Sequence, residues 1–229
     1  MKQLIYRNRF FIIPLFIFWI TGLISILSWG KAGLHILLNK LNSPLGDIFF
    51  QQVTNLGNGI LYIPLLFILV LISYRKAVIF TTGVIISNIL LYIGKHFLFK
   101  TSCRPAKYFE LYENYQLHFV EGVKIHYLHS FPSGHTTTVF TLFFMLCLLT
   151  RNNMLKIFYF IVAFLTGYSR IYLSQHFMVD VIAGSFLGTG GIIIACFYFE
   201  SRKNSGLYKS IKAVQKKRRK ANIPKLAPR

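Results

Sequence analysis

The sequence predicts an all-α membrane protein that crosses the bilayer with about six helices. Of its 229 residues, 54% are hydrophobic and 17% are aromatic, and only six are acidic, which is unusual for a soluble globular protein. Long runs without a charged residue recur along the chain, and one span of the hydrocarbon core takes about 20 such residues. The net charge of +20 is concentrated between these runs and in the C-terminal segment. A membrane accounts for this pattern better than nucleic acid does, so no nucleic-acid partner is expected.

Six runs are predicted as transmembrane helices, and together they form one membrane domain, residues 1–201. They lie near residues 10–29, 59–74, 77–93, 136–150, 155–169 and 177–199. The first run has a basic start like that of a signal peptide, but it is longer than a signal core and no small-residue cleavage site follows it. We therefore expect a retained helix. The fourth and fifth runs are short, and we expect their polar borders to extend them as helix.

Positive charges predict the orientation of these helices, because loops rich in Lys and Arg stay in the cytoplasm. Cations precede the first run, and Arg75 and Lys76 separate the second from the third. Arg151 and Lys156 separate the fourth from the fifth, and the basic tail 202–229 follows the sixth. Both termini are therefore expected in the cytoplasm, where the tail would bind anionic lipid headgroups.

The loop on the opposite side of the membrane, residues 94–135, also carries positive charge, against this rule. Its cations are Lys95, Lys100, Arg104, Lys107 and Lys124. A solvated basic loop would account for them, and for Lys107 we prefer that interpretation. For the others a phosphate-bearing ligand is the functional explanation, since cationic side chains form strong hydrogen bonds to phosphate oxygens.

The stretch SRIYLSQHFMVD, residues 169–180, combines an arginine, a histidine and a carboxylate. His176 and Asp180 are four residues apart and would share one face of a helix. The carboxylate can then accept a hydrogen bond from one imidazole nitrogen and raise the basicity of the other. A structural pair that closes a helix start is the alternative. Arg170 favours the functional interpretation, because a tight turn would bring its phosphate-binding guanidinium beside His176.

The stretch PSGH, residues 132–135, has the pattern of a helix start. Pro132 stops the preceding segment, Ser133 is a favoured N-cap, and Gly134 lets a ligand approach the backbone closely. Free N–H groups at a helix N-terminus bind anions, and His135 is placed to donate a proton. An ordinary helix start with an incidental histidine is the alternative when this stretch is considered alone.

No metal and no other cofactor is expected. The three cysteines are scattered, and His126, His129 and His135 do not follow the spacing of a known zinc site. Neighbouring cations would repel a metal ion, and the acidic residues are too few for magnesium. The sequence also lacks a Gly-rich nucleotide-binding loop.

Together these stretches resemble the signature of the type 2 phosphatidic acid phosphatases, the lipid phosphate phosphatase–haloperoxidase superfamily. That signature is written K-x6-R-P, P-S-G-H and S-R-x5-H-x3-D. Its second and third parts match at every fixed position, and the chain is identified as a bacterial membrane member. The first part departs from the pattern, because Phe97 occupies the lysine position before Arg104 and Pro105. We choose Lys95 for the role of this lysine, with Lys100 as the alternative.

The resemblance implies a mechanism in which a histidine carries the phosphoryl group. His176 would attack phosphorus and form a phosphohistidine, Asp180 would hold the ring, and His135 would protonate the leaving oxygen. The phosphate oxygens would be bound by Arg104, Arg170, Lys95, Ser133 and the amide of Gly134. Such chemistry needs no metal and depends on positioning and charge complementarity.

The resemblance and the membrane location imply a lipid phosphate phosphatase of the bacterial cytoplasmic (inner) membrane, with its active site on the periplasmic face. The expected partners are membrane lipids and a lipid phosphate substrate. Polyprenyl diphosphate, phosphatidylglycerol phosphate, phosphatidic acid and lipid A 1-phosphate are the candidates. A phosphotransferase that passes the group to another lipid or sugar is one alternative, and a non-catalytic lipid binder or transporter is another.

Overall fold

The computed structural model describes residues 2–200, and the basic tail 202–229 lies outside the described residues. Within this range the secondary structure is helical throughout, without a strand. The helices are α1 (Lys2–Arg7), α2 (Arg9–Asn39), α3 (Pro44–Val53), α4 (Tyr62–Ile72), α5 (Tyr74–Ile93), α6 (Pro105–Tyr112), α7 (Gly134–Leu149), α8 (Asn153–Tyr172) and α9 (Met178–Glu200). A 3₁₀ turn, η1 (Thr54–Gly57), follows α3, and a π-helical turn, η2 (Gly94–Leu98), continues α5. The all-α prediction is confirmed.

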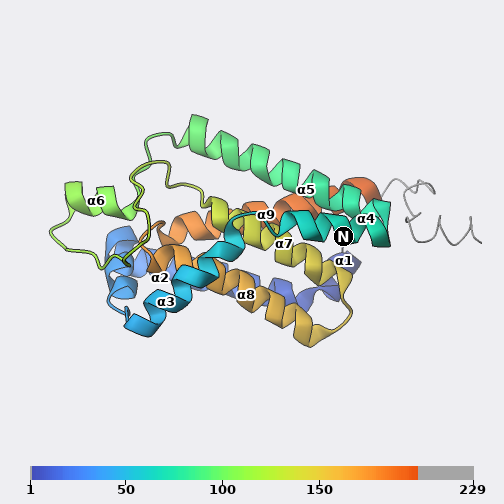
Figure 1. Ribbon diagram of the computed structural model, residues 1–229, viewed down its shortest axis with the longest axis horizontal. Helices are drawn as coiled ribbons and strands as arrows, with labels where there is room; N and C mark the ends of the chain where they lie inside the picture. Colours follow the sequence, from blue (N-terminus) through green and yellow to red (C-terminus); the bar gives the residue numbers. More distant parts are fainter. Residues whose placement is uncertain (1, 201–229) are drawn as a thin grey trace, which may run out of the picture.

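The long helices lie side by side along the long axis of the molecule (Figure 1). Helices α2, α5 and α8 run toward the end that carries α6, and α7 and α9 run back from it. We call this end, with residues 94–133 and 173–177, the α6 end. The opposite end carries α1 and the α7–α8 turn, and we call it the N-terminal end. The C-termini of three long helices and the N-termini of two therefore meet at the α6 end.

The count of six spans holds only approximately. Among residues 2–200, four helices are long and apolar enough to cross a membrane: Arg9–Asn39, Tyr74–Leu98, Asn153–Tyr172 and Met178–Phe199. A fifth span results if Pro44–Gly57 and Tyr62–Ile72, which meet at an angle of 47°, are counted as one, and α7 is apolar but has only 16 residues.

Two predicted boundaries differ from the structure. The first helix continues beyond residue 29 to Asn39, across a kink where Gly30 has φ 67°, a conformation that glycine adopts without a steric penalty. The predicted second span, 59–74, contains an α4 of 11 residues, and α3 and η1 precede it as a bent extension. Polar residues interrupt the apolar pattern in α3 and η1, so hydropathy did not predict them.

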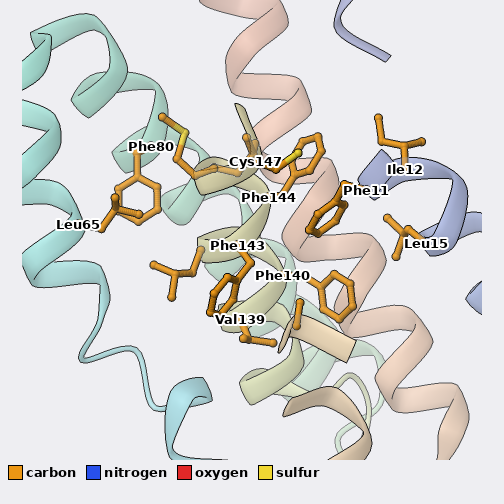
Figure 2. Close-up of a cluster of buried hydrophobic side chains, with 14 of the residues drawn as sticks. Phe11, Ile12, Leu15, Leu65, Phe80, Val139, Phe140, Phe143, Phe144 and Cys147 are labelled. Atoms are coloured by element: carbon orange, nitrogen blue, oxygen red, sulfur yellow. The ribbon is translucent and has the colours of Figure 1, made fainter. Parts of the chain in front are cut away.

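Helix α7 forms the centre of the buried core. Figure 2 shows its apolar side chains between Phe11 of α2 on one side and Leu65 of α4 on the other. The ring of Phe11 lies 5.3 Å from that of Phe144 and 6.3 Å from that of Phe140, in tilted and edge-on arrangements that aromatic pairs prefer. This packing holds α7, and with it the PSGH stretch, in a fixed place.

Small residues let α9 approach its neighbours closely. A Cβ atom at Gly188 would lie 2.3 Å from the carbonyl oxygen of Thr137 in α7, and one at Gly191 would lie 2.1 Å from Ser87 Oγ in α5. At Gly184 it would lie 2.6 Å from the carbonyl oxygen of Ser133. Transmembrane helices commonly use small residues for such contacts. Here they place the start of α7 directly against the first turns of α9.

Candidate active site

A tight turn after α8 brings His176 back to Arg170. The backbone N–H groups of Gln175 and His176 both donate to the carbonyl oxygen of Arg170, at 2.9 and 3.0 Å. Ser174 adopts a left-handed conformation in this turn, with φ 51°. The structure thus brings together the arginine and the histidine of the SRIYLSQHFMVD stretch, as their spacing predicted.

His176 and Asp180 form a buried pair, each 2% exposed. Nδ1 of the imidazole lies 3.3 Å from Asp180 Oδ2, which also accepts hydrogen bonds from Ser130 Oγ and, at 3.0 Å, from the amide of Phe177. Because the carboxylate takes the hydrogen on Nδ1, the lone pair of Nε2 is available.

The pKa of His176 is lowered to about 3, chiefly by burial; Asp180 opposes this shift, and the charges of Arg104 and Arg170 add to it. The ring is therefore neutral at pH 7, as a nucleophile must be.

The PSGH stretch starts α7 as predicted. Ser133 is the N-cap, and its Oγ accepts hydrogen bonds from the amide of Thr136 at 3.4 Å and from the Thr136 hydroxyl at 2.9 Å. The amide of Ser133 donates to the backbone oxygen of Asp180 at 3.0 Å, so this stretch is tied to the start of α9. Gly134 follows as the first residue of α7. His135 lies with Nε2 2.8 Å from Asn58 Oδ1.

Arg170 has an unused hydrogen-bond donor. Its side chain is 7% exposed, and Nη1 donates to Thr54 Oγ1 at 2.6 Å. Its Nε is buried and has no hydrogen-bond partner among the described residues. A buried donor without a partner costs about 1–3 kcal/mol. An anionic oxygen would remove that cost, so this guanidinium is suited to binding phosphate.

Arg104 is held beside the turn that follows α8, through hydrogen bonds to Gln175. Its Nε donates to the carbonyl oxygen of Leu128 at 2.9 Å, and Nη1 donates to the backbone and side-chain oxygens of Gln175 at 3.3 and 3.2 Å. Burial lowers the pKa of Arg104, and the charge of Asp180 opposes this shift. The guanidinium is therefore partly desolvated, which strengthens its attraction for an anion.

Lys95, and not Lys100, belongs to this cluster. Lys95 lies in the π-helical turn η2, and its Nζ donates to the carbonyl oxygen of His129 at 2.8 Å. It is within electrostatic range of Arg104, Arg170 and Asp180, whereas Lys100 is exposed.

Sequence reasoning missed four residues that hold the proposed site residues. They are Thr54, which contacts Arg170, Asn58, which contacts His135, Ser130, which contacts Asp180, and Gln175, which contacts Arg104. Gln175 and Ser130 lie next to recognised motif residues, which is a weak signal. Thr54 and Asn58 come from a polar turn far away in the sequence, where nothing indicated a role.

The described part of the chain contains no group of three or more His, Cys, Asp or Glu side chains placed to hold a metal ion. His129 instead pairs with Lys95, through its carbonyl oxygen and through Nδ1, which lies 3.3 Å from the Lys95 carbonyl oxygen. Metal-independent chemistry stays a prediction.

An all-helical membrane fold with arginine and lysine side chains around a buried histidine–carboxylate pair defines a class of protein, the integral-membrane phosphatases. Within this class the chain belongs to the PAP2 superfamily, whose sequence profile matches residues 76–205, more than half of the chain.

Named relatives agree with this assignment. A lipid A 4′-phosphatase of Porphyromonas gingivalis is 27% identical over 180 residues, which cover 74% of this chain and 72% of the relative. A lipid A 4′-phosphatase of Bacteroides thetaiotaomicron is 38% identical over 73 residues, which cover 32% of each protein.

Two crystal structures are similar in fold over most of this chain. LpxE of Aquifex aeolicus is 32% identical with a TM-score of 0.62, covering 72% of this chain and 93% of that one. A transmembrane PAP2-type phosphatidylglycerolphosphate phosphatase of Bacillus subtilis is 21% identical with a TM-score of 0.57, covering 84% of this chain and 97% of that one. The second likeness shows the fold alone.

Proposed function

We propose that this protein hydrolyses a phosphate ester of lipid A in the bacterial cytoplasmic membrane. The observation that carries the proposal is the buried, unpartnered Nε of Arg170 beside the His176–Asp180 pair, because it offers an anion a donor next to a nucleophile. Sequence similarity to a lipid A 4′-phosphatase over most of the chain supports the choice of lipid among the envelope candidates.

In the first chemical step, Nε2 of His176 attacks phosphorus. A nitrogen–phosphorus bond forms while the bond between phosphorus and the lipid oxygen breaks, and His135 gives the leaving oxygen a proton. Asp180 holds the His176 ring and stabilises the positive charge that develops on it. The product is a phosphohistidine and the dephosphorylated lipid.

In the second step, water attacks the phosphohistidine. His135 now takes a proton from the water, an oxygen–phosphorus bond forms, and the bond to Nε2 of His176 breaks to release phosphate. Negative charge on the phosphoryl oxygens is stabilised in both steps. The groups proposed for this are Arg104, Arg170, Lys95, the hydroxyl of Ser133 and the amide of Gly134. The Ser133 oxygen accepts the N-cap hydrogen bond, and its own hydrogen would serve the phosphate.

The proposed topology places the α6 end at the periplasmic face of the membrane. Cationic residues before α2, in the first turn of α5 and between α7 and α8 gather at the N-terminal end, which the positive-inside rule assigns to the cytoplasm. The basic tail 202–229 would then bind anionic headgroups on the cytoplasmic side. A lipid in the outer leaflet could present its phosphate to the site without leaving the bilayer.

The proposal is tested by phosphate release from a panel of lipids with purified protein, using His176→Ala as the control. The panel contains lipid A with a 1-phosphate or a 4′-phosphate, phosphatidylglycerol phosphate, phosphatidic acid and a polyprenyl diphosphate. We expect the wild type to act best on a lipid A phosphate and His176→Ala to release none. Preference for another lipid would overturn the substrate assignment.

Two other functions predict different results in the same assay. A phosphotransferase would move labelled phosphate from lipid A to a second lipid or sugar without releasing free phosphate. A non-catalytic lipid binder or transporter would leave the substrate intact and would keep its biological effect after His176→Ala.

A further inference from the structure

A short polar turn outside the matched family region touches two of the proposed site residues. This TNLGN turn, residues 54–58, consists of η1 and Asn58. Thr54 Oγ1 accepts a hydrogen bond from Arg170 Nη1 at 2.6 Å, and Asn58 Oδ1 lies 2.8 Å from His135 Nε2. The family profile begins at residue 76, so Thr54 and Asn58 both lie outside the part of the chain that defines the family match.

Gly57 allows the turn to rest directly on His135. A Cβ atom at Gly57 would lie 2.8 Å from the Cβ of His135 and 3.1 Å from its Cα. Any side chain there would force the turn away from the start of α7. The close approach therefore fixes the separation between Asn58 and the imidazole ring.

A chain of amide side chains determines which atom of Asn58 faces the ring. Asn55 Nδ2 donates to the carbonyl oxygen of Gln51 at 3.4 Å, and Asn58 Nδ2 donates to Asn55 Oδ1 at 3.2 Å. With its NH₂ group used in this way, Asn58 presents its oxygen to His135. Because an amide oxygen only accepts hydrogen bonds, Nε2 of His135 must carry the hydrogen.

We propose that the TNLGN turn is a positioning element for phosphoryl transfer, with one residue for each of two tasks. Asn58 keeps the hydrogen of His135 on Nε2, the atom that has to protonate the leaving oxygen. Thr54 holds the guanidinium of Arg170 by one nitrogen so that its unpartnered Nε meets the phosphate. Neither residue exchanges a proton or touches phosphorus. This inference rests on the function proposed above.

The hydrogen bond to Asn58 does not prevent proton donation. As the bond between phosphorus and the lipid oxygen breaks, negative charge develops on that oxygen. Charged acceptors form hydrogen bonds roughly twice as strong as neutral ones. Binding of the anionic phosphate favours uptake of a second proton on Nδ1 of His135. The resulting imidazolium passes its Nε2 hydrogen to the leaving oxygen and returns to the neutral ring, and Asn58 holds that hydrogen before the step.

Substrates that differ in their leaving group test the role of Asn58. A lipid phosphate monoester leaves as an alkoxide and needs the proton of His135, whereas p-nitrophenyl phosphate leaves as a stable phenolate and does not. We expect Asn58→Ala to lower kcat about 10-fold on the lipid, as for the loss of one hydrogen bond, and to leave p-nitrophenyl phosphate turnover unchanged.

The matched control is Asn88→Ala, because Asn88 is an exposed asparagine of α5 that donates to the Val84 carbonyl oxygen of its own helix. It should change neither rate. An equal loss on both substrates for Asn58→Ala would show a merely structural role and would overturn the assignment. Full activity of Asn58→Ala on the lipid would also overturn it.

Thr54 should show the opposite pattern, since Arg170 binds phosphate whatever the leaving group is. Thr54→Val keeps the shape of the side chain and removes the acceptor. We expect kcat/KM to fall about 5-fold on both substrates alike, and Thr54→Ser, which keeps the hydroxyl, to restore it. Failure of Thr54→Ser to restore activity, or a loss confined to the lipid, would overturn this role.

A measurement that does not depend on turnover decides the tautomer. In the ¹⁵N NMR spectrum of the purified full-length protein with labelled histidine, the His135 signal is assigned by its loss in His135→Gln. We expect the neutral ring to carry hydrogen on Nε2 in the wild type and a mixture of tautomers in Asn58→Ala. Hydrogen on Nδ1 in the wild type would refute the inference. A wild type no more active than His176→Ala would instead refute the proposed function, and the NMR result on the turn would stand.

Discussion

The two ends of the helical bundle are both basic, yet their cations are arranged differently. At the α6 end, Arg104 and Arg170 interact electrostatically with the buried His176, and Arg170 is itself 7% exposed with a donor unused. At the N-terminal end, Arg7 and Arg151 are exposed and line a depression of about 470 Å³. No histidine or carboxylate lines that depression among the described residues.

Burial explains the difference between these two pairs of arginines. Charges exposed to water are screened and attract an anion weakly, whereas partly buried charges are screened much less. Positive charge by itself therefore indicates membrane topology. Positive charge that is desolvated beside a neutral histidine indicates a phosphate site.

The largest effect should come from the nucleophile. We expect His176→Ala to lower kcat on the lipid substrate by at least about 10⁴-fold, as removal of a catalytic nucleophile does in other enzymes. The double variant Arg7→Gln with Arg151→Gln removes two exposed cations from the N-terminal end and should keep activity within about 2-fold, as surface charges contribute little. A comparable loss in the double variant would break the comparison between the two ends.

The next largest effect should come from Arg170. Arg170→Gln removes the charge that we propose stabilises the phosphoryl oxygens, and we expect kcat/KM to fall by about 10²–10³-fold. Arg170→Lys should not restore it, because an ammonium group lacks the planar arrangement of donors that contacts both Thr54 and phosphate. Steady-state kinetics on one lipid substrate suffice for both variants. Near-normal activity of Arg170→Lys would show that only the charge matters.

A smaller effect should separate Lys95 from Lys100. Lys95 lies within electrostatic range of Arg104 and Asp180, and we expect Lys95→Ala to lower kcat/KM by about 10-fold or more. Lys100 is exposed, and Lys100→Ala should leave kcat/KM unchanged, like the double variant at the N-terminal end. A loss in neither variant would mean that this loop does not follow the pattern of the family.

The smallest effect should come from Ser130, whose hydroxyl donates to Asp180. Ser130→Ala removes one hydrogen bond from the carboxylate that orients His176. We expect kcat to fall about 5-fold, as for the loss of roughly 1 kcal/mol. Ser73→Ala, at a residue that lines the depression of the N-terminal end, serves as the control and should be silent. Unchanged kcat in Ser130→Ala would show that Asp180 is held sufficiently by the Phe177 amide.

Local spacing was enough to predict part of the site. The i, i+4 distance between His176 and Asp180 and the helix start at Ser133 both describe contacts within one turn of chain, and the structure contains both. The two residues do not share one helix as expected, because His176 lies in the turn before α9, which begins at Met178. Hydropathy likewise predicted the long helices α5, α8 and α9. It was wrong for the end of the first helix and for the second span, because Gly30 continues the helix through a kink and α3 mixes polar with apolar residues.

By itself, the sequence determined the all-helical membrane class, the PSGH helix start and the pairing of His176 with Asp180, since each follows from composition or from periodicity over a few residues. Only the tertiary structure decided that Thr54 meets Arg170 and that Asn58 meets His135, residues 116 and 77 positions apart in the chain. Such contacts depend on how α3 and η1 lie against α7 and α8. That arrangement follows from packing between helices, which no local pattern in the sequence records.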